Sequence, residues 1–229
     1  MAIATEEVVD LASTPLRELN QRLHDAEEGR FRVVNPNGAH AVACGIKTPL
    51  EVEIVGHVGY YCAGMNQHAQ VRVRGNVGTG VAENIMSGSV VVEGNASQSA
   101  GATGRGGLVV IHGDAAARCG ISMKGVDIVV RGSIGHMSAF MAQRGCLVVC
   151  GDAGDALGDS IYEAHIYVRG STAALGADCI EKELKEHHVD ELRSLLERAG
   201  FDDLDPAEFR RYGSARQLYN FKIDNAGAY

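Results

Sequence analysis

The sequence of 229 residues has no tryptophan, only four prolines and no run of 18 apolar residues. A helix that spans a membrane needs such a run, so membrane insertion is excluded. The formal charge of −8 argues against a nucleic-acid partner, because phosphate binding needs clustered lysine and arginine. The opening MAIATEEVVD carries acid where a secretory signal carries base followed by an apolar run, so we expect a cytoplasmic protein.

Glycine and proline are distributed in opposite ways. No proline occurs from residue 50 through 205, whereas 25 of the 29 glycines lie between Gly38 and Gly176. A flexible linker would contain both residue types. Glycine without proline fits a backbone that turns often and keeps its N–H groups hydrogen-bonded, which is typical of a repeat protein.

A repeat of 19 residues runs through this segment without insertion or deletion. It is marked by glycines at Gly56, Gly75, Gly94, Gly113, Gly132, Gly151 and Gly170. The residues two positions before them are Ile54, Val73, Val92, Ile111, Val130, Val149 and Val168. The residues that stand four positions before the glycines are Val52, Val71, Val90, Val109, Ile128, Leu147 and Ile166. All are aliphatic, and alternation before a glycine indicates a short strand with one face inward, followed by a corner.

One short strand cannot bury its inner face alone, but stacked copies form a continuous core. We therefore predict an all-β fold, a right-handed parallel β-helix with one strand per coil and about seven regular 19-residue coils. Glycine at the corner avoids a Cβ clash. A positive φ at this position would be one reason for the glycine. Helical, leucine-rich and hexapeptide repeats fit less well, because they differ in period or in residue pattern.

Three segments follow from these patterns: a helical segment over 1–30, the β-helix domain over 31–180, and a helical cap and tail over 181–229. Thr14-Pro15 predicts an N-cap with proline at the first helical position, before an apolar stripe of leucines. A second stripe ends at Ala199-Gly200, and Asp205, Pro206 and Glu208 resemble a capping box. We expect these flanking helices to cap the open ends of the solenoid.

Catalytic, cofactor-binding and metal-binding residues are not predicted in this chain. Cys62 and Cys119 share a repeat position but lie three coils apart, about 14 Å, and Cys146 and Cys150 are about 13 Å apart along one strand. No Cys-x-x-Cys or His-x-x-x-His pair occurs, so we expect reduced, buried cysteines. The glycine-rich stretch 101–107 is interpreted as a crowded corner and not as a phosphate loop.

Two further rows of residues follow the repeat. The residues directly after the glycines are His57, Asn76, Asn95, Asp114, Ser133, Asp152 and Ser171, which indicates turns hydrogen-bonded to the local backbone. Three positions before the glycines, facing outward, an apolar row begins after Glu53 and Arg72. This candidate interface stripe consists of Val91, Val110, Val129, Val148 and Tyr167. Either a flanking helix of this chain or another protein, including a second copy of the chain, covers it.

The segment Gly151-Asp-Ala-Gly154-Asp-Ala-Leu-Gly158 resembles the G-x-x-G-x-x-x-G repeat of the C-terminal (GXGXG) domain of the glutamate synthase large subunit. The resemblance covers about residues 30–180, with incomplete copies that begin at Gly56, Gly75 and Gly132. The ending from Ala207 through Leu218-Tyr219-Asn220 is also similar to this family. The whole chain resembles its free-standing version, the middle subunit of N-methylglutamate synthase, and more distantly a subunit of formylmethanofuran dehydrogenase.

This resemblance implies a scaffold that braces two other subunits and has no active site of its own. One partner would be a class-II glutamine-amidotransferase-like subunit, and the other an FMN-binding synthase-like subunit that also holds an iron–sulfur cluster. In agreement, residue 2 is Ala2 where an amidotransferase of that class needs cysteine. The implied reaction of the complex converts methylamine and L-glutamate into N-methyl-L-glutamate and ammonia. The structural corner glycines of the family pattern are Gly56, Gly75, Gly94, Gly113, Gly132, Gly151, Gly154, Gly158 and Gly170.

Other functions stay open on the sequence alone. The chain could serve a different glutamate-synthase-like or formylmethanofuran-dehydrogenase-like complex. A solenoid enzyme acting on carbohydrate is a further alternative, and it would need a groove lined with acids. The only tight acidic cluster is Asp152, Asp155 and Asp159.

Overall fold

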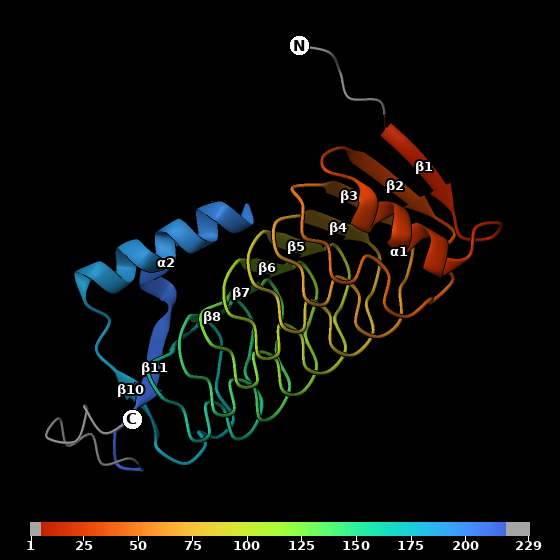
Figure 1. Ribbon diagram of the computed structural model, residues 1–229. Coiled ribbons are helices and arrows are strands. Elements are labelled where there is room, and N and C mark those ends of the chain that lie inside the picture. Colours follow the sequence, from red (N-terminus) through yellow and green to blue (C-terminus); the bar gives the residue numbers. More distant parts are fainter. Residues whose placement is uncertain (1–5, 219–229) are drawn as a thin grey trace, which may run out of the picture.

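A computed structural model describes residues 6–218 as a β-solenoid of about seven turns with two flanking helices (Figure 1). All strands form one sheet in the order β1-β2-β3-β4-β5-β6-β7-β8-β9-β11-β10. The strands are β1 (Glu6–Asp10), β2 (Arg30–Val34), β3 (Glu51–Val55), β4 (Gln70–Arg74), β5 (Ser89–Val92), β6 (Leu108–Ile111), β7 (Asp127–Val130), β8 (Cys146–Val149), β9 (His165–Val168), β10 (Cys179–Lys182) and β11 (Arg210–Ser214). The helices are α1 (Leu16–Asp25), α2 (Glu186–Ala199) and the short 3-10 helix η1 (Pro206–Glu208).

The predicted inward rows are confirmed. Val73 is the register partner of Val92, and Val92 is the partner of Ile111, so the same face repeats from coil to coil. Every residue of the two aliphatic rows is buried, with at most 2% exposed. A further inward row consists of single parallel bridges along Val58, Val77, Ala96, Ala115, Ile134, Ala153 and Thr172. The core is therefore a column of aligned side chains, as stacking of a fixed repeat requires.

The corner glycines are needed for space and not for their backbone conformation. Of the seven glycines of the repeat, Gly56 alone has a positive φ. At Gly75, a Cβ would lie 2.5 Å from the carbonyl oxygen of Gly56 in the preceding coil, and at Gly151 it would lie 2.6 Å from Ser133 Oγ. A side chain at these corners would therefore push neighbouring coils apart.

The left-handed backbone conformation lies seven residues after the repeat glycine instead. It occurs at Ala63, Ala82, Gly101, Gly120, Ala139 and Gly158, all with φ between 53° and 69°. Alanine and glycine are small enough for these buried corners, where the strain of a positive φ comes on top of close packing.

The polar row after the glycines bonds the next coil and not the local turn. Asn76 Oδ1 accepts from the backbone N–H of Asn95, and Asn95 Oδ1 accepts from that of Asp114, both at 2.8 Å. The series continues with Asp114, Ser133 and Asp152 as acceptors. The prediction of local turn bonds was wrong in this respect, because the repeat places the next coil's N–H within reach.

The amino-terminal end of the solenoid is closed by α1 and β1. Helix α1 begins one residue later than expected, with Pro15 at the N-cap and no side-chain cap from Thr14. Its leucines Leu19 and Leu23 are buried in the main core. Asn20 donates to Ala41 O and accepts from Ala43 N, which satisfies backbone groups at the open end. Strand β1, which the sequence did not predict, pairs in parallel with β2.

The carboxy-terminal end is closed by an antiparallel pair. Strand β11 pairs with β9, and β10 then pairs with β11, so the edge of β9 is covered. Helix α2 ends at Ala199, where the sequence predicted its end, and Gly200 follows in the left-handed conformation. Asp205 accepts from Ala207 N at the start of η1, but Glu208 pairs with Arg169 and closes no capping box. Within residues 6–218, no helix is long and apolar enough to cross a membrane.

Candidate functional site

The outer face of the sheet is divided into a half covered by α2 and an uncovered half. The outward side chains Val110, Val129, Val148 and Tyr167 share one buried cluster with Leu192, Leu195 and Leu196 of the helix. The sequence left open whether a helix of this chain or another protein covers these residues. In the structure, helix α2 of the same chain covers them. The candidate interface stripe is thus intramolecular from Val110 to Tyr167, and only Val91, at its end, is partly exposed.

Ion pairs hold α2 and the following segment on this face. Arg198 near the end of α2 pairs with Asp127 of β7 at 3.1 Å. Arg131 forms two hydrogen bonds to the carboxylate of Asp203, and its guanidinium lies 5.1 Å from the ring centre of Phe201. The two-pronged contact to Asp203 orients the segment after α2 more than a single exposed pair would.

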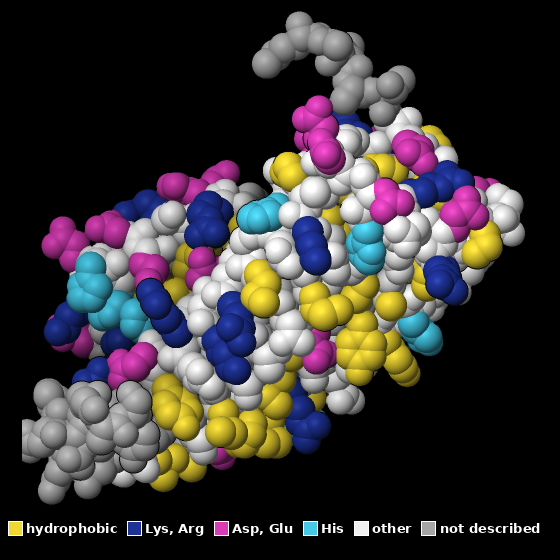
Figure 2. Space-filling view, in the orientation of Figure 1, with side chains coloured by type: hydrophobic (Ala, Val, Ile, Leu, Met, Phe, Trp, Pro, Cys, Tyr) yellow, Lys and Arg dark blue, Asp and Glu magenta, His cyan; other side chains and the backbone are white. Residues whose placement is uncertain are grey.

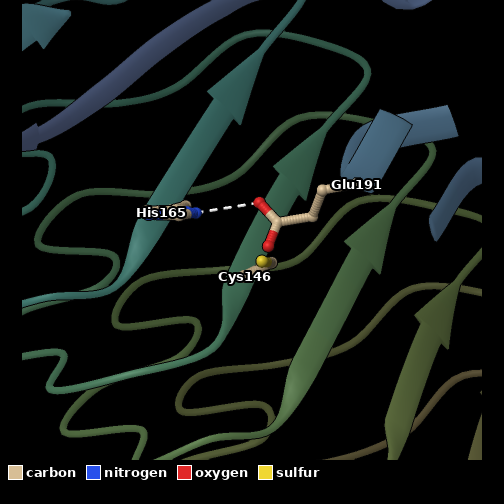
Figure 3. Close-up of side chains that lie close together, drawn as sticks. All are labelled: Cys146, His165 and Glu191. Carbon is tan, nitrogen blue, oxygen red and sulfur yellow. Dashed lines mark hydrogen bonds and ion pairs between the residues drawn. The ribbon is translucent and has the colours of Figure 1, made fainter. Parts of the chain in front are cut away.

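Three chemically reactive side chains meet beneath α2. Cys146 begins β8, His165 begins β9, and Glu191 lies on the facing side of the helix (Figure 3). His165 Nδ1 and Glu191 Oε2 are 2.8 Å apart, and the hydroxyl of Tyr167 donates to the same oxygen at 2.5 Å. The other carboxylate oxygen points toward the sulfur of Cys146 (Figure 3). A sulfur, a nitrogen and a carboxylate oxygen therefore lie within 4.8 Å of one another.

The cluster changes the proton affinity of its members. The hydrogen bond from His165 is the largest influence that lowers the pKa of Glu191 to about 2, against the effect of burial, and Tyr167 adds to it. Burial, followed by the negative charge of Glu191, raises the pKa of the Cys146 thiol. Burial and the hydrogen bond to Glu191 raise the pKa of Tyr167. The carboxylate thus stays ionised beside the neutral thiol of Cys146 and the neutral hydroxyl of Tyr167.

This arrangement does not favour a cysteine nucleophile. A nucleophilic cysteine needs a cationic neighbour that stabilises its thiolate. Cys146 instead lies beside the Glu191 carboxylate and is 5% exposed. The three atoms are, however, of the kinds that bind a divalent transition metal.

The uncovered half of the outer face carries alternating charges. Arg30 pairs with Glu51 at 2.7 Å, Arg74 with Glu53 at 2.5 Å, and Arg72 with Glu93 at 3.0 Å, each between neighbouring coils. An open groove of about 300 Å³ follows this surface from β1 to β5. The solvated pairs make this face polar, in contrast to the half beneath α2.

The turns of the solenoid carry exposed apolar side chains. Tyr60, Tyr61 and Met65 lie in one turn and are about half exposed, and Met86 and Met141 are also exposed. Figure 2 shows hydrophobic side chains gathered in patches over the turns on the face it presents. Tyrosine and methionine are enriched where proteins bind one another.

The residues singled out from the sequence serve mainly in stacking. The six cysteines are free thiols; five are buried, as predicted, whereas Cys44 is partly exposed. Asp152 and Asp159 are hydrogen-bonded within the stack: Asp152 accepts from Ser171 N and Oγ, and Asp159 from Ser160 Oγ and Ala177 N. Tyr219 and Asn220 lie outside the described residues.

The grouping of Cys146 with His165 was missed. Both residues stand five positions before a repeat glycine, so the period of 19 already implies that they are neighbours on adjacent strands. The spacing of the cysteines alone does not reveal this pair, because the neighbour of Cys146 is a histidine. Glu191 carries no such signal, because its place depends on how α2 packs.

Comparison with known proteins identifies a close relative. No protein-family model matches the chain, and no solved structure matches it. Protein GlxC of Rhizobium meliloti (strain 1021) is 64% identical over 226 residues, which cover 97% of this chain and 99% of that protein. Because the identity is high along nearly the full length of both proteins, the chain belongs to the family of Protein GlxC.

Proposed function

We propose that this protein is the scaffold subunit of a glutamate-synthase-like complex in the cytoplasm and has no active site of its own. The complex is N-methylglutamate synthase: methylamine displaces the amino group of L-glutamate, giving N-methyl-L-glutamate and ammonia. Two partner subunits carry the chemistry. One is class-II glutamine-amidotransferase-like, and the other is synthase-like and holds FMN and an iron–sulfur cluster.

The observation that carries this proposal is the role of the motif glycines Gly151, Gly154 and Gly158, which allow the coils to stack closely. A Cβ at Gly154 would lie 2.9 Å from His136 N, and one at Gly158 would lie 2.7 Å from Cys179 Sγ. With Gly151, the three glycines of the motif are thus required for close stacking of coils. Glycines that bind a ligand leave backbone N–H groups free for it. Here the N–H groups of all three donate to the preceding coil.

The shape and surface also suit a scaffold. The solenoid is a straight stack in which each coil bonds the next, so it resists bending between its ends (Figure 1). It exposes two different surfaces, the charged outer face of β1 to β5 and the apolar turns around Tyr60 and Met65. Two surfaces of different chemistry fit two different partners.

Co-expression with the two neighbouring reading frames tests the proposal. We expect all three chains to purify together, with a flavin absorption spectrum that this chain alone does not have. Gly94→Ala, which disrupts stacking, should release the partners, whereas Gly213→Ala should keep them, because a Cβ there meets only ordinary contacts. The proposal is wrong if the isolated chain binds FMN stoichiometrically or converts substrate without partners.

A further inference from the structure

We propose that Cys146, His165 and Glu191 bind a zinc ion that ties helix α2 to strands β8 and β9. The site does not depend on the proposed function, because it lies within this chain and can be measured on the isolated protein.

The fold fixes two of the three ligands before the metal arrives. Cys146 and His165 are register partners at the start of adjacent parallel strands, and both side chains point to the outer face. Glu191 reaches the same point from the helix, and all three ligand atoms lie within 4.8 Å of one another (Figure 3). Four-coordinate zinc binds cysteine sulfur at about 2.3 Å and nitrogen or oxygen at about 2.0–2.2 Å, so small side-chain adjustments would suffice.

The ligand types favour zinc over harder cations. Magnesium and calcium prefer oxygen ligands throughout, whereas a thiolate, an imidazole and a carboxylate suit a borderline-soft ion. Tyr167 supplies the outer contact that orients a ligating carboxylate, since its hydroxyl donates to Glu191 Oε2. Within residues 6–218, this is the one group of three such side chains with this spacing.

The site is also open on one side. About a third of the His165 and Glu191 side chains is exposed, although Cys146 is buried. Solvent therefore has a path to the cluster, and a water molecule can take the fourth position on the metal. The bound ion would link two strands to α2, which otherwise rests on leucine packing and a few ion pairs.

Cobalt titration of the full chain, with any affinity tag removed, tests the proposal directly. The protein is first treated with a chelator and then titrated with Co²⁺. We expect one ion per chain, with a near-ultraviolet band from sulfur bound to cobalt that disappears when Zn²⁺ is added. Cys146→Ser should abolish the band. Cys150→Ser, directly after the same strand and in the same buried cluster as the helix leucines, should keep it.

Companion variants separate a metal site from a plain hydrogen-bond cluster. His165→Gln and Glu191→Gln should lose stoichiometric zinc, whereas His187→Gln on the same helix should retain it. Tyr167→Phe should weaken zinc binding by about tenfold, as expected for loss of an outer contact. Zinc should raise the thermal midpoint of the wild type and leave that of Cys146→Ser unchanged.

The proposal is overturned if the folded wild type shows no sulfur–cobalt band and no stoichiometric zinc. It is equally overturned if Cys146→Ser and Cys150→Ser bind the metals alike. Because the wild-type result can overturn the proposal by itself, the test stays decisive even if a variant fails to fold. Loss of the partner subunits has no bearing on this measurement, so the two proposals fail independently.

Discussion

The side-chain oxygen Oδ1 of Asn76 accepts a hydrogen bond of 2.8 Å from the backbone N–H of Asn95, one coil later. The same oxygen occupies the space into which a Cβ on Gly94 would project. The absence of a side chain at one position therefore makes room for the polar contact that orients the next corner. The two rows of the repeat, glycine and polar residue, depend on each other.

Gly94→Ala should destabilise the protein strongly. Its Cβ would overlap Asn76 Oδ1 and lie 2.7 Å from Gly75 O, and the stacked backbone cannot move aside for one residue alone. Overpacking of this kind costs about 1–3 kcal/mol. Urea unfolding followed by circular dichroism measures the loss as a lower midpoint.

Gly213→Ala is the matched control for this substitution. Gly213 lies in β11, and a Cβ there would be 3.5 Å from the nearest atom, at the flexible Lys182 side chain. We expect a change within about 0.5 kcal/mol. Equal destabilisation by the two alanines would contradict the role given to coil spacing.

Asn76→Ala should cost less than Gly94→Ala. It removes the acceptor for Asn95 N–H, and a net hydrogen bond contributes about 0.5–1.5 kcal/mol. Asn76→Asp keeps an oxygen at the same place, as Asp114 does two coils later, and should stay close to wild type. A urea midpoint for Asn76→Asp as low as that for Asn76→Ala would show that the contact contributes nothing.

The stacked strands were predictable because their pattern is periodic. With Val73, Val92 and Ile111 spaced 19 residues apart, one register satisfies all coils, and any slip would bury polar residues. The end elements lack that redundancy. Strand β1 carries Glu6 and Glu7, and β11 carries Arg210 and Arg211, so their patterns did not indicate strands. They pair because an exposed sheet edge would otherwise stay open.

The site could be predicted only in part, for a related reason. Cys146 and His165 are brought together by the period, which the sequence shows. Glu191 meets them through the angle and height at which α2 packs on Val129, Val148 and Tyr167. That geometry depends on side-chain packing between elements far apart in sequence. The spacing of residues in the sequence does not predict such packing. The polar row was likewise read as local, because a single sequence does not show which coil receives each hydrogen bond.

Two valines distinguish the inner core from the helix-covered outer face. Val92 lies in the central column and Val110 beneath α2, and both are buried. Val92→Asp should prevent folding, because a charge would enter the column without a partner. Val110→Asp should release α2 and leave the stacked coils intact, because the carboxylate reaches water once the helix moves away.

Circular dichroism and limited proteolysis separate these outcomes. The Val110→Asp protein should keep its β signal and be cut within Glu186–Ala199, where the wild type resists. Size-exclusion chromatography should show the Val92→Asp protein as aggregated or expanded. If the two variants behave alike, the assignment of inner and outer faces is wrong.

Acid should loosen the last coils through Asp152. Hydrogen bonds from Ser171 N and then Ser171 Oγ hold the pKa of this carboxyl below its usual value of 3.8. Because the folded pKa is the lower one, the unfolded chain takes up a proton first as the pH falls. The contribution of Asp152 to stability is therefore full above pH 3.8 and is lost as the pH falls through the folded pKa.

Asp152→Asn isolates this effect from the general acid sensitivity of the protein. Asparagine holds the same place at Asn76 and Asn95 and accepts the equivalent hydrogen bond without titrating. Between pH 5 and pH 3, the urea midpoint should fall less for Asp152→Asn than for the wild type. Asp155→Asn is the second control, because it removes one negative charge from the same end of the solenoid. Its urea midpoint should depend on pH as that of the wild type does. Parallel pH profiles for the wild type and Asp152→Asn would mean that the Ser171 contacts do not depend on the charge of Asp152.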